Sequence, residues 1–394
     1  MPSGQHSASA SAVGYQYQTD WCLLELLRGG PRRPDSAISL EMHDDVAWEA
    51  NGTPTELLQT KHHIGATAGL GDKDVDVWKT LMVWMNTASP TDPQGPALIL
   101  VTTSTAKEGT AAYALRATGR STAHALELLT VAAQTSKSDE TKSSRERFLK
   151  LSPSERQVLV SRITVVDASP TVDDIDAKVR EELWAVLPDG HEDLFLGQLW
   201  RWWAGVSLDM LRRRRAAVDV SEARAYISSL RNRFSDDNLP TLIEIADVDE
   251  GSVVEALAAS PFVHQMRWVN YNQVNLRKAI VDYYRAVAQT VKWVEEDLIG
   301  LHELRSFEDN LRDEWSRVFA DMVEDLGDDA DEAQKIAMGK QLLRTLREST
   351  AVNVRAQYND PFFARGKRHE LADRGRVGWH PDFEARLEAL LTAV

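Results

Sequence analysis

Residues 37–63 read AISLEMHDDVAWEANGTPTELLQTKHH, and this stretch decides how the N-terminal part of the chain folds. Its first half, residues 37–50, alternates in polarity and is rich in strand-forming residues, which predicts a β-strand. The dipeptide Asn51-Gly52 then favours a tight hairpin turn. TELLQTKHH (55–63) follows as the returning strand. The sequence therefore predicts a hairpin built from two long strands.

The returning strand carries polar residues on one face. Side chains at i and i+2 share a strand face, so Gln59 and Lys61 lie together and Thr60 between them points away. One interpretation is a half-buried strand with a polar edge. The other is half of a metal-dependent nuclease site, and choosing between them needs the rest of the chain.

Helices and strands alternate around this hairpin. The aromatic and leucine spacing of residues 14–27 predicts a helix that ends at Gly29, and residues 1–11, which are small and polar, are expected to be disordered. Further segments up to about residue 190 are predicted as helices at 76–88, 107–136, 144–160 and 171–187, and as buried strands at 97–104 and 163–167. The sequence thus predicts an α/β domain that ends near residue 190.

The rest of the chain, residues 191–394, is expected to be mainly α-helical. Candidate helices in this region are 190–217, 220–234, 250–259, 272–299, 304–326 and 331–349. Residues 355–383 are rich in glycine and charge and are expected to be irregular. The boundary between the two regions is predicted near residue 190, within about twenty residues.

Composition narrows the class of protein. The chain is 43% hydrophobic and 27% charged with a net charge of −15, which argues against a passive nucleic-acid coat protein but not against an enzyme with a local basic channel. The single cysteine, Cys22, lies in an apolar run and is expected to be a buried core thiol. No apolar run approaches 18 residues, so we expect a cytoplasmic protein without a membrane span.

Metal-dependent cleavage of a phosphodiester needs oxygen ligands for Mg²⁺ and a positive group that stabilises developing charge. The strand before the turn offers three acids: Glu41, Asp44 and Asp45. On the returning strand, the amide oxygen of Gln59 and the backbone carbonyl of Thr60 are further candidate oxygen ligands. Lys61 is expected to activate water or to stabilise the transition state.

This arrangement resembles the PD-(D/E)xK nuclease superfamily in its Q-x-K branch, typified by Mrr-type restriction enzymes. Four stretches in order resemble the double-stranded-DNA endonuclease domain of antiphage effectors of the Lamassu and cyclic-oligonucleotide-activated types: GYQYQ (14–18), E-x-x-DDV (41–46), LLQTKHH (57–63) and DVWKTL (76–81). The similarity covers roughly residues 12–190 and implies a restriction-endonuclease-like fold for this α/β domain.

The resemblance implies a role for each matching residue. The acidic metal ligand of the motif corresponds to Asp44 or Asp45. Asp45 is preferred as this ligand because, on a strand, it would share a face with Glu41 and His43. Gln59 takes the position of the second acidic ligand, and Lys61 is the lysine of the motif. Glu41 and Gln18 are expected to support the site. The expected cofactor is Mg²⁺, for which Mn²⁺ is expected to substitute, and Gln in place of the commoner Glu at position 59 should weaken metal binding.

The C-terminal end carries a second resemblance. LADRGRVGWHPDF (371–383) resembles the C-terminal signature of ABC-three-component systems, which are Lamassu-like, over about residues 300–394. This resemblance implies an SMC-like ATPase and a small middle component as partners. It implies no chemistry for the motif itself.

Several other features have ordinary explanations beside functional ones. His62 and His63 point to opposite faces of a strand and are expected to be bystanders near the phosphate at most. The tryptophan run at 199–205 is expected in a core or interface rather than in a base-stacking platform, and Arg212 to Arg215 either touch DNA phosphates or pair with acids. His369 and His380, near Asp373 and Asp382, suggest a second metal site, but a turn that packs Trp379 and Phe383 into the core is preferred.

These observations predict a Mg²⁺-dependent double-stranded DNA endonuclease effector of an antiphage system. Its helical C-terminal region is expected to keep it silent, and active oligomers are expected to cut both strands. Two alternatives stay open. One is a non-catalytic scaffold or sensor with a nuclease-like fold. The other is a nuclease gated by a cyclic nucleotide, which requires a ligand-binding domain in the C-terminal region.

Overall fold

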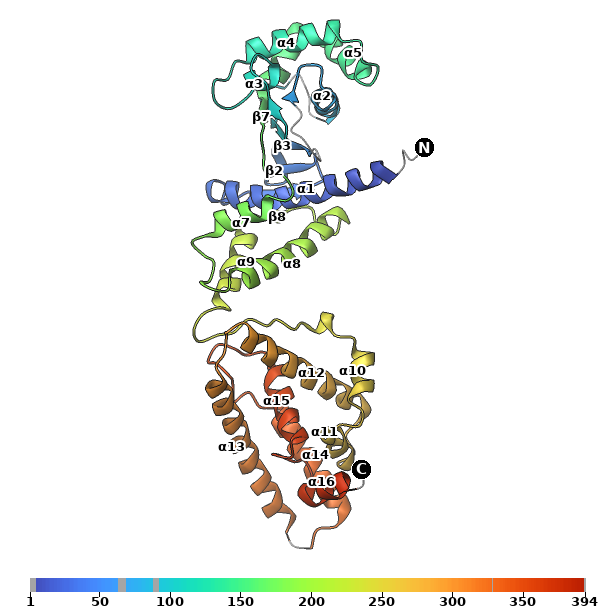
Figure 1. The fold of residues 1–394 in the computed structure, drawn as a ribbon, viewed down its shortest axis with the longest axis vertical. Helices are drawn as coiled ribbons and strands as arrows, with labels where there is room; N and C mark the ends of the chain where they lie inside the picture. Colours follow the sequence, from blue (N-terminus) through green and yellow to red (C-terminus); the bar gives the residue numbers. More distant parts are fainter. Residues whose placement is uncertain (1–4, 63–68, 88–91, 328, 393–394) are drawn as a thin grey trace. The chain divides into compact units, whose positions relative to one another are not determined.

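The computed structural model describes residues 5–62, 69–87, 92–327 and 329–392 (Figure 1). The chain divides into two units, Met1–Ser229 and Leu230–Val394, and each is described by itself. The first unit combines a mixed β-sheet with helices, and the second is helical. The expected fold class is therefore confirmed.

The first unit begins with a long helix, α1 (Gln5–Gly29), so residues 5–11, which the sequence predicts to be disordered, are helical. The further elements of this unit are η1 (Gly30–Arg32), β1 (Ala37–Leu40), β2 (Val46–Ala50), β3 (Thr53–Lys61), β4 (Gly69–Leu70), α2 (Val75–Thr87), β5 (Ala97–Thr102), β6 (Thr105–Ala106), α3 (Ala111–Ala114), α4 (Thr122–Thr135), α5 (Lys142–Lys150), α6 (Pro153–Arg162), β7 (Ile163–Val166), α7 (Ile175–Leu183), α8 (Glu192–Leu211) and β8 (Val218–Asp219). Helix α9 (Val220–Asn232) ends just beyond the division.

The main sheet has the strand order β7-β5-β3-β2-β1-β8. Strands β1, β2 and β3 form an antiparallel meander, whereas β5 and β7 run parallel to β3. Asn51 and Gly52 both have positive φ, 51° and 76°, as the two central residues of a type I′ turn require. The predicted hairpin turn is confirmed, and an irregularity in the ladder between Trp48 and Glu49 then shifts the pairing so that Val46 faces Leu58.

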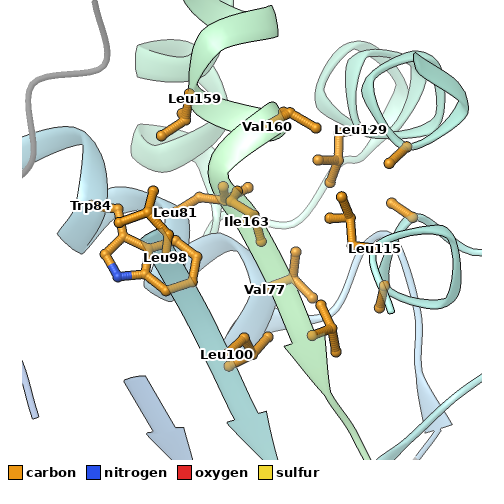
Figure 2. Packing of buried hydrophobic residues seen from close by; sticks show 14 of the residues in the cluster. Val77, Leu81, Trp84, Leu98, Leu100, Leu115, Leu129, Leu159, Val160 and Ile163 are labelled. Atoms are coloured by element: carbon orange, nitrogen blue, oxygen red, sulfur yellow. The ribbon is translucent and has the colours of Figure 1, made fainter. Parts of the chain in front are cut away.

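Helices cover both faces of this sheet. On one face, Leu57 of β3 and the even-numbered Leu98 and Leu100 of β5 join a buried cluster with α2, α4 and α6, and Figure 2 shows Leu98, Leu100 and Ile163 of the sheet among side chains of these helices. On the other face, the Trp48 indole donates a hydrogen bond from Nε1 to Glu25 of α1 at 2.9 Å. Gln59 follows Leu57 along β3 and therefore extends from the face that α2 covers.

The strand predicted over residues 37–50 is two strands. β1 and β2 pair antiparallel with each other, Leu40 facing Val46, and residues 41–45 form the turn between them. Glu41 has a φ of 52°, a left-handed conformation that is uncommon for a residue with a side chain. The candidate acids therefore lie in a tight turn, and the expectation that Asp45 shares a strand face with Glu41 and His43 is wrong.

The boundary between the units lies further along the chain than the predicted position near 190. β8 pairs antiparallel with β1 and thus completes the edge of the sheet. In addition, Trp203 of α8 is buried and donates from Nε1 to the Thr19 carbonyl of α1 at 2.9 Å. Because these long-range contacts join residues 191–229 to the α/β core, they belong to the first unit.

The second unit comprises η2 (Ile245–Asp247), α10 (Glu250–Ala256), α11 (Pro261–Trp268), α12 (Gln273–Glu295), α13 (Leu301–Leu326), α14 (Glu332–Glu348), α15 (Pro361–Asp373) and α16 (Phe383–Thr392). Helix α15 packs against α11, α12 and α13 and lies centrally in this unit (Figure 1). A Cβ at Gly366 would lie 2.1 Å from the Asp282 carbonyl oxygen, so glycine allows the close approach of α15 to α12.

Residues 361–373 are therefore a buried helix within the segment that the sequence predicts to be irregular. Lys367 and Arg368 are almost fully buried there and pair with Glu308 at 2.6 Å and Glu314 at 2.5 Å, respectively. Buried ions need such partners, which lie more than fifty residues away in the sequence. Because this stretch is rich in charged residues, the sequence did not predict the buried helix that it forms.

Candidate active site

A tight acidic turn forms one side of the candidate site. The Glu41 N–H donates to the Asp45 carbonyl at 3.1 Å, which closes the turn, and the Asp45 N–H donates to Oδ1 of Asp44 at 3.0 Å. Gln18 of α1 donates from Nε2 to the Asp45 carbonyl at 2.7 Å and to Oε1 of Glu41 at 3.0 Å. Gln18 thus lies at the site as expected, and its side chain holds the turn through the backbone carbonyl of Asp45.

Asp45 bridges this turn to strand β3. Its Oδ1 accepts from Nε2 of Gln59 at 2.9 Å, and its Oδ2 accepts from the Thr60 N–H at 2.8 Å. The Thr60 hydroxyl also donates to Oδ2 at 3.1 Å, so this side chain contacts the carboxylate, contrary to the expectation that it points away. The structure brings Asp45, Gln59 and Thr60 into direct contact.

Asp44 lies deeper, with 8% of its surface exposed. Its Oδ2 accepts a hydrogen bond from Nε1 of Trp84 at 2.9 Å, and its Oδ1 contacts Nε2 of Gln59. Burial raises the pKa of the Asp44 carboxyl to about 6, and the hydrogen bonds from Gln59 and Trp84 oppose this rise. The negative charge of Asp45 adds to the rise. A proton on Asp44 is therefore gained and lost close to neutral pH.

Lys61 completes the chain of polar contacts. Its Nζ donates to Oε1 of Gln59 at 3.1 Å, so the amide of Gln59 lies between a cation and two carboxylates. Both side chains lie on the face of β3 that α2 covers. The predicted pair at i and i+2 is thus joined directly to both predicted acids.

Trp84 is a residue of this site that sequence reasoning missed. It lies in α2 among the apolar side chains of the sheet core, and its indole nitrogen is seen at the edge of that cluster in Figure 2. Sequence shows only an amphipathic helix at 76–88, in which a tryptophan looks like a core residue. A buried tryptophan N–H needs an acceptor, and here that acceptor is Asp44.

From the sequence, Arg213 is recognised only as a member of the arginine run at residues 212–215. Its guanidinium donates to the Glu41 carbonyl and lies 3.2 Å from Sδ of Met42, so it clamps the outside of the acidic turn. Arg214 and Arg215 pair with Asp209 and Glu222, respectively. The run thus divides its contacts between the acidic turn and neighbouring acids.

The donor set fits a hard divalent cation. Two carboxylates and an amide side chain converge, and oxygen ligands of these kinds suit Mg²⁺. Gln59 directs Nε2 at Asp44 and Asp45, so holding a cation requires its amide to turn and present Oε1 instead. Asp44, Asp45 and Gln59 are therefore the residues that would hold the metal, with the Thr60 carbonyl as the further ligand expected from the sequence.

The other candidate features have structural roles. Nε2 of His62 accepts from the Val172 N–H at 3.3 Å, and its ring lies 4.8 Å from that of Tyr17, whereas His63 lies outside the described residues. Cys22 is buried in α1, as expected. In the tryptophan run, Trp202 stacks on Tyr226 with ring centroids 4.4 Å apart. These tryptophan and cysteine positions serve packing within the first unit.

His380 and Asp382 approach Glu332 closely enough to suggest a metal-binding group. However, Nδ1 of His380 accepts from the Asp382 N–H at 3.1 Å, so its proton lies on Nε2, 3.5 Å from Glu332. The two acids also pair with Arg386 and Lys335. Trp379 and Phe383 are buried, so the preferred interpretation of GWHPDF as a packing turn agrees with the structure.

Residues 262–387 match C-terminal domain 7 of the ABC-three component (ABC-3C) systems. The expected ABC-3C-like C-terminal region is confirmed, and its matched segment begins at 262 rather than at about 300. The match connects the chain with the ABC-3C systems through its second unit. A search of the curated proteins finds no match to this chain.

Within the described part of the chain, none of the helices combines the length and the apolar character needed to cross a bilayer.

Proposed function

We propose that this chain is a metal-dependent endonuclease of double-stranded DNA and the effector of an ABC-3C antiphage defence system. One observation carries the proposal. Lys61, Gln59, Asp45 and Asp44 form a continuous chain of side-chain contacts where β3 meets the acidic turn. This is the constellation that the resemblance to the PD-(D/E)xK nucleases requires, and the fold assembles it from two segments, β3 and the acidic turn.

The metal would be held by Asp45, Asp44 and Gln59. A Mg²⁺ ion held there would supply Lewis-acid polarisation of a phosphate oxygen and activation of water as the nucleophile. Lys61, within reach of the same amide, stabilises negative charge that develops on the phosphate. Trp84 holds the inner carboxylate in place, and Gln18 and Arg213 hold the turn that carries both acids.

The arginine run supports a substrate that carries phosphates. Arg212, Arg213 and Arg214 are exposed at the end of α8, and Arg213 reaches the acidic turn itself. Although the chain has a net charge of −15, such a local basic group beside the site attracts a polyanion. We therefore assign the DNA backbone to this side of the turn.

The match of the second unit supports control by partners of the same system, which we propose are an SMC-like ATPase and a small middle component. An unregulated nuclease would destroy its host, so activity should require assembly or release. We further propose that two nuclease units meet to cut both strands. Full-rate cleavage by the first unit as a strict monomer would contradict this part of the proposal.

The test is cleavage of a supercoiled plasmid with Mg²⁺ or Mn²⁺ by the wild type and by Lys61→Ala, with the partner components present. Loss of the lysine should slow cleavage on the order of 100-fold or more, as expected when a group that stabilises transition-state charge is removed. Lys79→Ala is the matched control, because Lys79 is exposed on α2 and pairs with Glu140 at 2.7 Å.

Metal binding provides a second measurement that does not depend on activity. Mg²⁺ should raise the melting temperature of the wild type and of Lys61→Ala but not that of Asp45→Asn. If Lys61→Ala cuts as fast as the wild type, the site assignment is wrong. If neither cleavage nor a Mg²⁺-dependent melting shift is found, the chain is a non-catalytic scaffold or sensor with a nuclease-like fold.

A further inference from the structure

The second unit contains a cavity of about 390 Å³. Its wall is formed by α12, α14 and α15 together with Trp379, and all but two of its lining residues fall within the segment that matches the ABC-3C domain. This volume lies at the lower end of the range for sites that bind small molecules. The cavity is therefore suited to a small organic molecule rather than to a peptide.

The surface of this cavity is mainly apolar. Tyr271, Val281, Leu343, Leu346 and Trp379 are all buried and face this cavity from four different segments. Surfaces of this kind favour an aliphatic or aromatic body in the ligand, because such a body loses its contact with water there.

The charged residues in the wall are mainly basic. Five basic residues stand against two acids: Arg277, Lys278, Arg347, Arg365 and Arg368 against Glu250 and Asp282. In the described part of the chain, no carboxylate forms an ion pair with Arg277 or Lys278, and Arg365 donates from Nε to the Arg347 carbonyl at 3.0 Å. Burial raises the pKa of Asp282 to about 6, and the charges of Arg365, Arg285 and Lys278 oppose this rise, so Asp282 stays mostly ionised at neutral pH and offsets only part of the positive charge. The wall thus has an excess of positive charge.

Three buried polar atoms belonging to the wall residues have no hydrogen-bond partner within the described chain: Nη1 of Arg368, Nδ1 of His369 and Nε1 of Trp379. Their side chains are 3%, 8% and 1% exposed. Arg368 donates from Nε and Nη2 to Glu314, so Nη1 is the nitrogen of its guanidinium without a partner in the described chain. Buried donors without partners are rare in folded proteins and call for an explanation such as a bound group.

We propose that this cavity is a binding site for a small organic anion, which carries one acidic head group on an apolar or aromatic body. The head group lies among Arg277, Arg365 and Arg368, and the body lies against Leu343 and Trp379. The cavity, the excess of basic residues and the unpartnered donors point to the same chemistry. This inference concerns the second unit alone and does not depend on the proposed nuclease activity.

The full-length protein is titrated with 8-anilinonaphthalene-1-sulfonate and, in parallel, with N-phenyl-1-naphthylamine, its analogue without the sulfonate. The anionic probe should bind with one saturable site per chain and more tightly than the neutral probe. Arg277→Gln and Arg365→Met should each weaken binding of the anionic probe about tenfold and leave the neutral probe unchanged. Arg277 is exposed, so its substitution preserves the fold.

Arg344→Gln is the matched control, because Arg344 is exposed on α14 and does not line the cavity. Competition by AMP or by benzoate then distinguishes a phosphate head group from a carboxylate. The inference is overturned if the anionic probe fails to saturate, or if it binds Arg277→Gln and Arg365→Met as tightly as it binds the wild type.

Discussion

Nε1 of Trp84 donates a hydrogen bond to Oδ2 of Asp44 at 2.9 Å, which links the hydrophobic core of the sheet to the acidic turn. Trp84 is 1% exposed and packs among the side chains that hold α2 on β5. The position of the inner carboxylate is therefore fixed by the core. Trp84 holds Oδ2 of this carboxylate, while Gln59 contacts its Oδ1.

Trp84→Phe should keep the packing and remove the donor. Hydrogen bonds to charged groups contribute about 1.5–3 kcal/mol, so we expect cleavage to slow about tenfold or more. Because this hydrogen bond lowers the pKa of Asp44, its loss should also move the acidic limb of the pH–rate profile to higher pH. The rate is measured between pH 5 and pH 9.

Trp78→Phe is the control for this experiment, since Trp78 lies in the same helix and donates from Nε1 to the Asp72 carbonyl at 2.8 Å. It should lower the melting temperature without moving the pH–rate profile. An equal displacement of the profile in both variants would mean that Trp84 acts only through packing.

Asp44 should make stability depend on pH. Its folded-state pKa of about 6 lies above the unfolded value of 3.8, so the folded chain binds this proton more tightly. The stability contribution is fully present below about pH 4 and is lost as the pH rises through 6. Asp44→Asn should remove this dependence, worth about 3 kcal/mol at most, and raise the melting temperature at pH 7.5 without metal. Asp139→Asn, at an exposed position, should leave the dependence intact.

Gln59→Glu should lower the stability of the metal-free protein and raise its affinity for Mg²⁺. A third carboxylate beside Asp44 and Asp45 adds repulsion, so the variant should melt at a lower temperature in the presence of EDTA. The added negative charge should strengthen Mg²⁺ binding about tenfold, measured by calorimetry. Gln59→Leu, which has no oxygen ligand, should lose the response to Mg²⁺. Equal Mg²⁺ affinity in all three proteins would remove Gln59 from the metal site.

Arg213→Asn should loosen the acidic turn. Asn tolerates the positive φ of 57° at this position, so the substitution removes the contact with the Glu41 carbonyl without adding backbone strain. Hydrogen exchange at the amides of residues 42–45 should become faster, and cleavage should slow several-fold. Arg214→Asn is the control for hydrogen exchange alone, because Arg214 pairs with Asp209 at the surface, at 3.6 Å. If amide hydrogen exchange in Arg213→Asn equals that of the wild type, the turn is stable without the contact from Arg213.

The position of the unit boundary predicts how fragments fold. A fragment of residues 1–232 retains β8, α8 and all of α9, whereas a fragment of residues 1–190 loses the strand that pairs with β1 and the buried Trp203. The longer fragment should melt cooperatively in circular dichroism. The shorter one should melt at a clearly lower temperature and bind hydrophobic dyes. Equal melting temperatures would place the boundary near 190 after all.

Local patterns predicted much of the first unit. Asn51-Gly52 specified its turn because a type I′ turn needs two residues that accept positive φ, and neighbours along the chain suffice for that. The pair Gln59 and Lys61 followed from the two-residue period of a strand. The C-terminal resemblance was carried by a short signature and agrees with the match over residues 262–387.

Residue order alone did not reveal where the acids lie. The sequence of residues 37–50 alternates like one strand, yet Glu41 takes a left-handed conformation and the chain reverses there. This reversal is stabilised by Gln18 and Arg213, which are distant in sequence. Long-range hydrogen bonds of this kind have no local pattern that predicts them.

By itself, the sequence determined the two-unit α/β and helical plan, the Asn51-Gly52 hairpin and the face shared by Gln59 and Lys61, since each depends on short-range periodicity. Only the tertiary structure decided that Trp84 holds Asp44, that the acids lie in a turn, and that α15 is buried. The physical reason is common to all three. A buried polar or charged group is stable only beside its partner, and in each case that partner comes from a distant segment that folding brings close.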